Sequence, residues 1–169
     1  MQILFIWVIF LKEKLYDRQG AIEYARRWAF GRNPKYYNFD PVGGDCTNFI
    51  SQCIHAGSQI MNYSKYGWYY KSGYDKSPSW SGVEYLHKFL TQNQGIGPYG
   101  EEVDVGKIQI GDIVQLSFDG KVFAHSLLIV EKNGNEIFIS THTQDEYRRN
   151  LATYRFYKIR FIHINGVRY

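Results

Sequence analysis

The hydrophobic pattern of the chain changes period once, near Lys107, and this change limits the fold more than any other feature. Upstream, apolar residues recur at three- and four-residue spacing, as on one face of an amphipathic helix. Asp17 is the expected cap of the first helix, and Ser81-Gly82-Val83-Glu84 is a capping box that opens the third. Downstream, short apolar runs are bounded by turn signals such as Asp119-Gly120 and Asn133-Gly134, which is typical of hairpins. Helices are predicted over residues 17–31, 46–56 and 81–90, and strands over residues 113–118, 122–130, 136–142 and 155–163. Helices followed by an antiparallel meander indicate the α+β class.

Length and composition indicate a single globular domain. The 169 residues suffice to bury a core, and 44% hydrophobic with 18% aromatic content argues against disorder. The net charge of +4 is mild, and basic residues occur singly or as pairs such as Arg26-Arg27 and Arg148-Arg149. No basic run of the kind that nucleic-acid binding needs is present. A weakly anionic partner such as a cell surface stays open.

The first residues form a separate apolar segment. Met1 to Leu11 is almost wholly apolar but shorter than the roughly 20 residues that a membrane span needs. Three interpretations of this segment stay open: a truncated export or anchor segment, a packed element of the domain, or an interfacial helix. Membrane contact is therefore expected only through residues 1–11. We therefore divide the chain into an N-terminal segment, residues 1–15, and a single domain, residues 16–169. We expect a monomer. The cell envelope or the outside of the cell is the favoured location, and a cytoplasmic location stays possible.

A cysteine stands at the start of the second predicted helix. In Gly43-Gly44-Asp45-Cys46, two glycines and an acid lead into an apolar-periodic run that reaches about Ala56, with Gly57 as its left-handed end residue. The unpaired N–H groups and the helix dipole favour negative charge there, which predicts a lowered thiol pKa and a nucleophilic role. The alternative is that Cys46 is one more small buried residue.

The second cysteine has a different expected role. Cys53 lies seven residues further along the same helix, so its Cα is about 10 Å from that of Cys46, too far for a disulfide. Its apolar neighbours indicate a core thiol. Neither cysteine has the close Cys or His companion that structural zinc sites show. We expect no metal and no cofactor.

Two histidines are predicted to meet on one hairpin. If Asn133-Gly134 are the central residues of a type I′ turn, His125 lies directly opposite His142, with Cβ atoms about 5 Å apart. A register shift of one residue would instead place them on opposite faces. Packing or solvent exposure of both rings is the plain alternative.

Together with Cys46, this pair suggests a hydrolytic triad. His125 is the preferred base and His142 the residue that orients it, following the general logic of thiol acyl transfer, although the two roles can be reversed. Asp45 caps the helix in the simplest reading and competes as the orienting acid in another.

Loop residues supply the predicted substrate contacts, which are Asn38, Asp45, Trp68 and Trp80. Asn38 lies in a polar and aromatic loop just before the nucleophile, where side chains can bind an oxyanion. The two tryptophans lie in an aromatic-rich excursion, residues 62–80, which is long enough to wall a cleft. Packing of these aromatics over the core is the alternative.

At these residues the chain resembles the putative amidase domain family of papain-like cysteine hydrolases, relatives of the NlpC-type and CHAP cell-wall peptidases. The matching segments include Tyr16-Asp17-Arg18, Gly43 to Gln52, Trp68-Tyr69-Tyr70, Ser79-Trp80, Gly111-Asp112, His125-Ser126 and His142-Thr143. The resemblance implies a nucleophile helix packed on a small antiparallel barrel, with Cys46 as nucleophile, His125 as base and His142 in third position. It also implies hydrolysis of an amide, with a peptide bond of cell-wall peptidoglycan as the expected substrate. Acyl transfer by the same machinery and a non-catalytic wall-binding module are the alternatives.

Overall fold

The computed structural model describes residues 11–169, which form an α+β structure. Its α-helices are α1 (Arg18–Trp28), α2 (Cys46–Ser58), α3 (Pro78–Ser81) and α4 (Val83–Gln92). Its strands are β1 (Glu13–Lys14), β2 (Gly97–Val103), β3 (Ile113–Ser117), β4 (His125–Asn133), β5 (Glu136–Thr141), β6 (Glu146–Asn150) and β7 (Lys158–Arg168). The α+β class is confirmed, whereas the anchor, signal and interfacial readings of the N-terminal segment concern residues 1–10, outside the described range.

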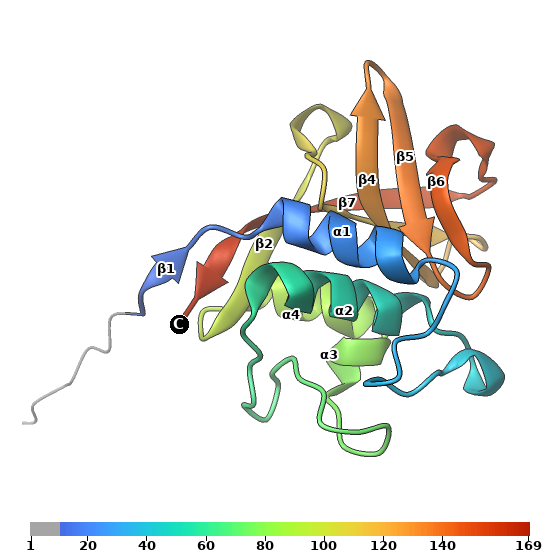
Figure 1. Ribbon diagram of the computed structural model, residues 1–169. Coiled ribbons are helices and arrows are strands. Elements are labelled where there is room, and N and C mark those ends of the chain that lie inside the picture. The colour runs from blue at the N-terminus through green and yellow to red at the C-terminus, as the bar shows by residue number, and fades with distance from the viewer. Residues whose placement is uncertain (1–10) are drawn as a thin grey trace, which may run out of the picture.

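The strands form one antiparallel sheet built around the long β7 (Figure 1). The order β1-β7-β3-β4-β5-β6 contains the expected meander from β3 to β6, and β2 pairs with β7 as well. The described sheet is open, because no pairing joins β6 back to β2. The sequence therefore predicted the meander, while the expected closed barrel is not found. Strands β1, β2 and β6 were missed, because they are short or carry little apolar alternation.

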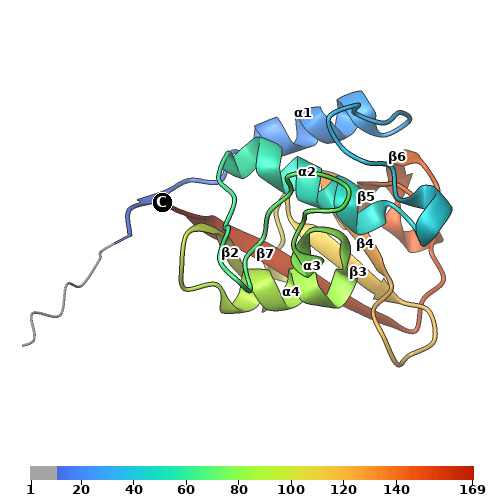
Figure 2. The ribbon, with the colours of Figure 1, turned by 90° about the horizontal axis from the view of Figure 1, so that it is seen from below.

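The helices pack on one face of the sheet, and strand side chains build a second core. Figure 2 shows α2, α3 and α4 gathered in front of β3, β4 and β7. The first core combines α1, α2 and α4 with alternate sheet residues such as Leu128 of β4 and Ile162 of β7. The second core contains Leu127, Ile129 and Ile139 but no α-helix residue. The alternation along β4 therefore decides which of its side chains faces α2.

Two of the predicted helix signals hold and two do not. The Asp17 side chain accepts a hydrogen bond from the N–H of Gly20, as an N-cap does, and α2 begins at Cys46. The capping box is wrong, since Ser81 belongs to α3 and the cap residue of α4 is Gly82. Gly57 does not end α2 either: the left-handed residue is Gln59, with φ of 58°.

Gly57 instead lets α1 approach α2. Its carbonyl oxygen accepts a hydrogen bond from the N–H of Asp17 at 3.0 Å. A Cβ at this position would stand 2.4 Å from the Tyr16 ring and 2.5 Å from the Asp17 carbonyl oxygen. The absence of a side chain is thus a packing requirement that sets the distance between the two helices.

A buried carboxylate fixes the same end of α1 to the sheet. Asp112 accepts hydrogen bonds from Arg18 at 2.6 Å and from the N–H of Ile164 at 3.1 Å, and its other oxygen lies 2.7 Å from Nδ1 of His163. The Gly111-Asp112 segment of the sequence therefore has a structural role. No helix within residues 11–169 has the length and apolarity that crossing a membrane requires.

We expect Gly57→Ala to lower the free energy of unfolding by about 1–3 kcal/mol, because overpacking against Tyr16 outweighs the better helix propensity of alanine. Chemical denaturation measures this change. Gly106→Ala is the matched control, since nothing lies within 4 Å of the Cβ that it adds. Equal stability of the two variants would contradict this account of the α1–α2 contact.

Candidate active site

Cys46 is the first residue of α2 and is nearly buried, with 8% of its surface exposed. Its Sγ lies 3.8 Å from the Thr47 hydroxyl. Burial raises the pKa of this thiol, although hydrogen bonds from the Ser126 backbone and from the hydroxyls of Thr47 and Thr143 oppose that effect. The lowered thiol pKa expected from the helix dipole is therefore wrong for this structure: burial is the larger effect.

The backbone around Cys46 adopts conformations that are rare for residues with side chains. Gly43 and Gly44 have φ of 131° and 111°, and Thr143 has φ of 82°. The Thr143 hydroxyl accepts a hydrogen bond from the N–H of Asp45 at 3.0 Å. This hydrogen bond holds the turn after β5 against the start of α2. Backbone strain such as that at Thr143 concentrates at functional sites.

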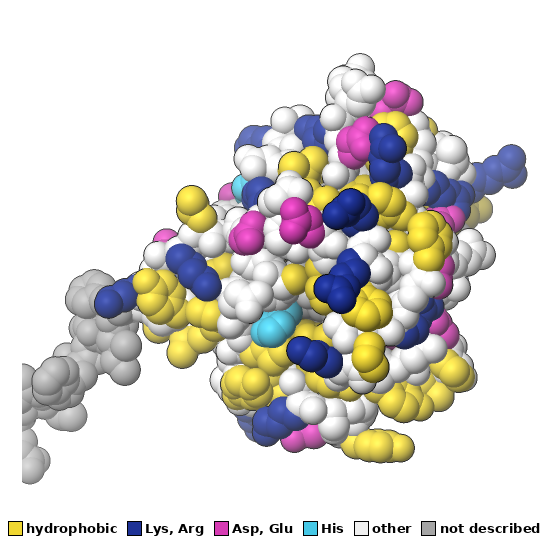
Figure 3. Space-filling view, in the orientation of Figure 1, with side chains coloured by type: hydrophobic (Ala, Val, Ile, Leu, Met, Phe, Trp, Pro, Cys, Tyr) yellow, Lys and Arg dark blue, Asp and Glu magenta, His cyan; other side chains and the backbone are white. Residues whose placement is uncertain are grey.

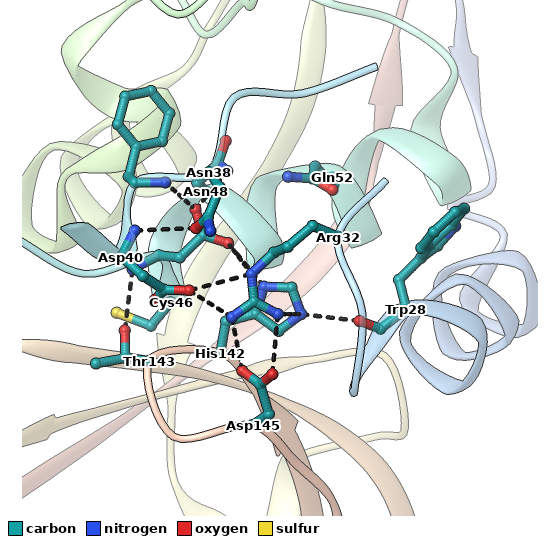
Figure 4. Close-up of polar contacts among 12 residues, drawn as sticks. Trp28, Arg32, Asn38, Asp40, Cys46, Asn48, Gln52, His142, Thr143 and Asp145 are labelled. Carbon is teal, nitrogen blue, oxygen red and sulfur yellow. Dashed lines mark hydrogen bonds and ion pairs between the residues drawn. The ribbon is translucent and has the colours of Figure 1, made fainter. Parts of the chain in front are cut away.

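The residue before Cys46, Asp45, has a buried carboxylate that pairs with the imidazole of His142. Figure 4 shows His142 among Arg32, Trp28 and Thr143. Oδ2 of Asp45 is 2.7 Å from Nδ1 of His142, and both side chains are 1% exposed. The other ring nitrogen, Nε2, lies 2.9 Å from the carbonyl oxygen of Trp28. The ring stacks on Phe49 of α2, with centroids 3.8 Å apart. His142 is therefore fixed on the α2 side of the sheet, and both of its nitrogens are engaged.

A hydrogen-bond chain holds the Asp45 carboxylate from behind. Trp80 donates its indole N–H to Oδ1 of Asn48 at 2.8 Å, and Asn48 donates Nδ2 to Oδ1 of Asp45 at 2.8 Å. The N–H of Phe39 also donates to Oδ1 of Asp45, at 2.9 Å. The carboxylate is thereby oriented before any substrate arrives.

Arg32 joins the loop before Cys46 to the turn after β5. It donates to Asp40 at 3.1 Å through Nε and to Asp145 at 3.0 Å and 2.8 Å through its two terminal nitrogens. Its Nη1 also lies 3.3 Å from Nε2 of His142, and its Nε lies 3.6 Å from Asp45. The guanidinium thus neutralises Asp40 and Asp145 and lies against both Asp45 and the His142 ring.

His125 does not meet His142, because the hairpin register differs from the predicted one. The turn residues are Gly134 and Asn135 rather than Asn133 and Gly134. Asn133 pairs with Glu136, and after a bulge Leu128 pairs with Ser140. The predicted opposition of His125 and His142 is therefore wrong, and the two rings lie on opposite faces of the sheet.

His125 faces the second core. It shares its side of β4 with Leu127 and Ile129, and its ring lies 6.1 Å from Phe118 and 6.2 Å from Tyr154. Burial lowers the pKa of His125 to about 4. The residue facing α2 at this end of β4 is Ser126, whose hydroxyl lies 3.0 Å from that of Thr47. Neither the predicted contact between Cys46 and His125 nor one between Cys46 and His142 is found among the described residues. The Cys46 thiol instead has the Ser126 backbone and the hydroxyls of Thr47 and Thr143 as neighbours.

Three of the four predicted substrate contacts have other roles. Trp68 and Trp80 are fully buried and donate their indole N–H groups to Ser51 and Asn48, so the reading of these rings as cleft walls is wrong. Asp45 is buried and committed to His142. Asn38 is exposed, and its side chain accepts a hydrogen bond from the N–H of Asp40 within the loop.

The sequence analysis missed Arg32, Asn48 and Thr143. Asn48 and Thr143 each lie within two residues of a predicted site residue, which is a usable signal. Nothing local marks Arg32, because its partner Asp145 is 113 positions away. Within residues 11–169, no group of three or more His, Cys, Asp or Glu side chains is arranged to hold a metal ion.

Comparison with known proteins assigns the chain to a family. A family model described as the putative amidase domain matches residues 15–165, and the chain belongs to that family. It is 35% identical over 140 residues to the uncharacterized protein YhbB of Bacillus subtilis (strain 168), covering 79% of this chain and 43% of YhbB. It is 21% identical over 140 residues to the uncharacterized protein YjcM of the same organism, covering 77% of this chain and 31% of YjcM. The chain thus spans less than half the length of these relatives, and no solved structure matches it.

We expect the burial of neutral His125 to make the free energy of unfolding depend on pH. The pKa of about 4 lies below the ordinary value of 6.5, so the unfolded chain binds more protons than the folded chain between these two pH values. The free energy of unfolding should therefore fall as the pH drops from about 6.5 to about 4, by roughly 1–3 kcal/mol. Urea titrations across this window measure the slope, and His125→Gln should flatten it. An unchanged slope in that variant would contradict the assignment.

Proposed function

We propose that this protein is a cysteine-dependent amide hydrolase with Cys46 as its nucleophile. The observation that carries the proposal is a thiol in the first turn of α2 that directly follows Asp45, whose carboxylate is held in a buried pair with His142. Membership of the putative amidase domain family supports the reaction class. A papain-like arrangement, in which the nucleophile helix packs on an antiparallel sheet, is part of this proposal.

The thiol needs a proton acceptor, because its raised pKa keeps it neutral at physiological pH. The geometry favours His142 over His125 for this role. His142 lies on the α2 side with Asp45 at Nδ1, which matches the base and orienting acid of a catalytic triad. In the free protein Nε2 faces the Trp28 carbonyl and no contact with Sγ is found among the described residues, so the proposed proton transfer requires the thiol and the ring to approach each other when substrate binds. Catalytic hydrogen bonds often form only in the substrate complex.

The reaction then follows the general course of thiol acyl transfer. His142 takes the thiol proton, and the thiolate of Cys46 attacks the amide carbonyl carbon. Unpaired N–H groups at the start of α2 bind the oxyanion. The histidinium donates its proton to the amine as the C–N bond breaks, which leaves a thioester on Cys46. Water gives a proton to His142 and attacks the thioester, so that a carboxylic acid leaves and the thiol is restored.

The proposed substrate is a peptide bond of cell-wall peptidoglycan, on the strength of the resemblance to cell-wall peptidases. Acyl transfer shares every step up to the thioester and differs only in the acceptor, an amine in place of water. A non-catalytic binding module is the second candidate. It is favoured by the near-complete burial of Cys46 and by the engagement of both His142 nitrogens.

The nucleophile is tested by incubating the protein with peptidoglycan fragments and identifying the soluble products by mass spectrometry. We expect product release that falls by about 10³-fold or more in Cys46→Ser, because serine is not activated in this environment. Hydrolysis adds water to the cleaved bond, whereas transfer yields a product that contains an added amine such as glycinamide. Release that is unchanged in Cys46→Ser would exclude the proposed nucleophile, and a wild-type protein that binds fragments without releasing products would favour the binding module.

The base is tested by comparing the two histidines. We expect His142→Gln to lower kcat by about 10²–10⁴-fold, the usual contribution of a general base, whereas His125→Gln keeps kcat near the wild-type value. Circular dichroism establishes that each variant is folded. Asp45→Asn keeps the shape of the carboxylate and should lower kcat with little change in KM. Loss of kcat in His125→Gln alone would reverse the assignment.

A further inference from the structure

We propose that a basic groove along α1 binds an acidic peptide segment and thereby selects amide substrates with carboxylates next to the reactive bond. We define the α1 groove as the hollow of about 890 Å³ lined by Tyr24, Arg26, Arg27, Trp28, Asn33 and Lys35, among others. The link to substrates rests on the proposed function, whereas binding itself does not. The residues that line the α1 groove belong to α1, to the loop that follows α1, and to α2 through Ala56.

The charge of the α1 groove is strongly one-sided. Arg26, Arg27 and Lys35 line it and are exposed, and Glu23 is the one acidic residue among the lining side chains. None of the three cations forms an ion pair within residues 11–169, although ten of the other basic or histidine side chains there do. Figure 3 shows dark-blue side chains over α1 on this face. Unpaired guanidinium groups in a hollow favour carboxylate partners, which they can bind through two hydrogen bonds.

The aromatic part of the α1 groove is fixed in place. Tyr24 donates its hydroxyl to Gln52 of α2 at 2.7 Å and accepts a hydrogen bond from Asn33 at 2.9 Å. Its ring lies 6.5 Å from that of Trp28, and Arg27 lies 5.4 Å from the centre of the Trp28 ring. A ligand thus meets a preformed surface of rings and cations, which lowers the entropic cost of binding.

The α1 groove is connected to the candidate active site through one residue. Trp28 lines the groove, while its carbonyl oxygen lies 2.9 Å from Nε2 of His142. His142 in turn contacts Asp45, the residue before Cys46. Trp28 and His142 are thus the described link between the α1 groove and the segment that carries Cys46.

An acidic peptide suits the α1 groove better than a nucleic acid does. Three cations are fewer than the roughly 6–10 phosphate contacts of typical DNA-binding proteins. The hollow is a local feature bounded by Ala56 and Pro34, and two or three carboxylates match its charge. Phosphate polymers and anionic membranes are the other occupants that the experiment must separate.

A second hollow offers a matched control. It has a volume of about 660 Å³ and is lined by Lys65, Tyr66, Tyr85 and Lys88, among others. It also pairs two cations with aromatic rings, but its lining residues include none of the contacts of His142. Reversing Arg26 and Arg27 to Glu, or Lys65 and Lys88 to Glu, changes the net charge by the same amount, from +4 to 0.

The experiment uses the full chain with Cys46→Ser, so that binding is measured without turnover. The probe is a fluorescein-labelled peptide of four Gly-Glu repeats, with four Gly-Gln repeats as the neutral control, and fluorescence anisotropy measures Kd. We expect R26E/R27E to weaken binding by about tenfold or more, K65E/K88E to change it by about twofold or less, and added salt to weaken it in the parent protein. R26Q/R27Q removes the charges without reversing them and should give an intermediate loss.

Three outcomes would overturn the proposal. They are equal loss in both charge-reversed variants, equal affinity for the Gly-Gln control, or selective binding of polyphosphate or of vesicles with anionic lipids in place of the acidic peptide. Failure of the proposed hydrolysis is a separate result, because Kd here does not depend on Cys46. In the active protein, R26E/R27E should raise KM for carboxylate-bearing substrates while kcat is largely kept.

Discussion

The site depends on the burial of one carboxylate, that of Asp45. A buried charge without partners is far too costly to keep, and here three donors from different parts of the chain share it: the N–H of Phe39, the amide of Asn48 and the ring of His142. The guanidinium of Arg32 adds an opposite charge 3.6 Å away. Because one donor lies in a loop, one on α2 and one after β5, satisfying the carboxylate fixes these three elements relative to Cys46.

This arrangement has a chemical consequence for the thiol. The interactions that satisfy Asp45 also hold His142, whose Nε2 is occupied by the Trp28 carbonyl. Burial at the same time keeps Cys46 protonated. Under the proposed mechanism, the free protein is therefore a resting state in which the thiol is neutral and both nitrogens of His142 are occupied. Activation would then depend on a substrate contact that frees the imidazole.

The sequence predicted local features well and long-range ones poorly. The start of α2 at Cys46 and the cap at Asp17 follow from nearby residues, and both are found. The predicted hairpin register was wrong for two reasons: the turn residues are Gly134 and Asn135 rather than Asn133 and Gly134, and a β-bulge lies between Ile129 and Glu131. The moved turn changes the pairing by two positions and keeps every side chain on its face, whereas the bulge changes it by one and puts His125 on the face opposite His142. The contact between Asp45 and His142 joins residues 97 positions apart, and no local pattern encodes such a distance.

Trp28 connects the candidate active site to the α1 groove. This residue lines the α1 groove, and its carbonyl oxygen lies 2.9 Å from Nε2 of His142. Any ligand that moves this residue must change the free energy of the His142 hydrogen bond, and by linkage the state of His142 must change the affinity of that ligand by the same factor. If both proposals hold, a groove occupant that moves Trp28 is therefore coupled to the orientation of His142 without a separate allosteric element, because a single residue belongs to both.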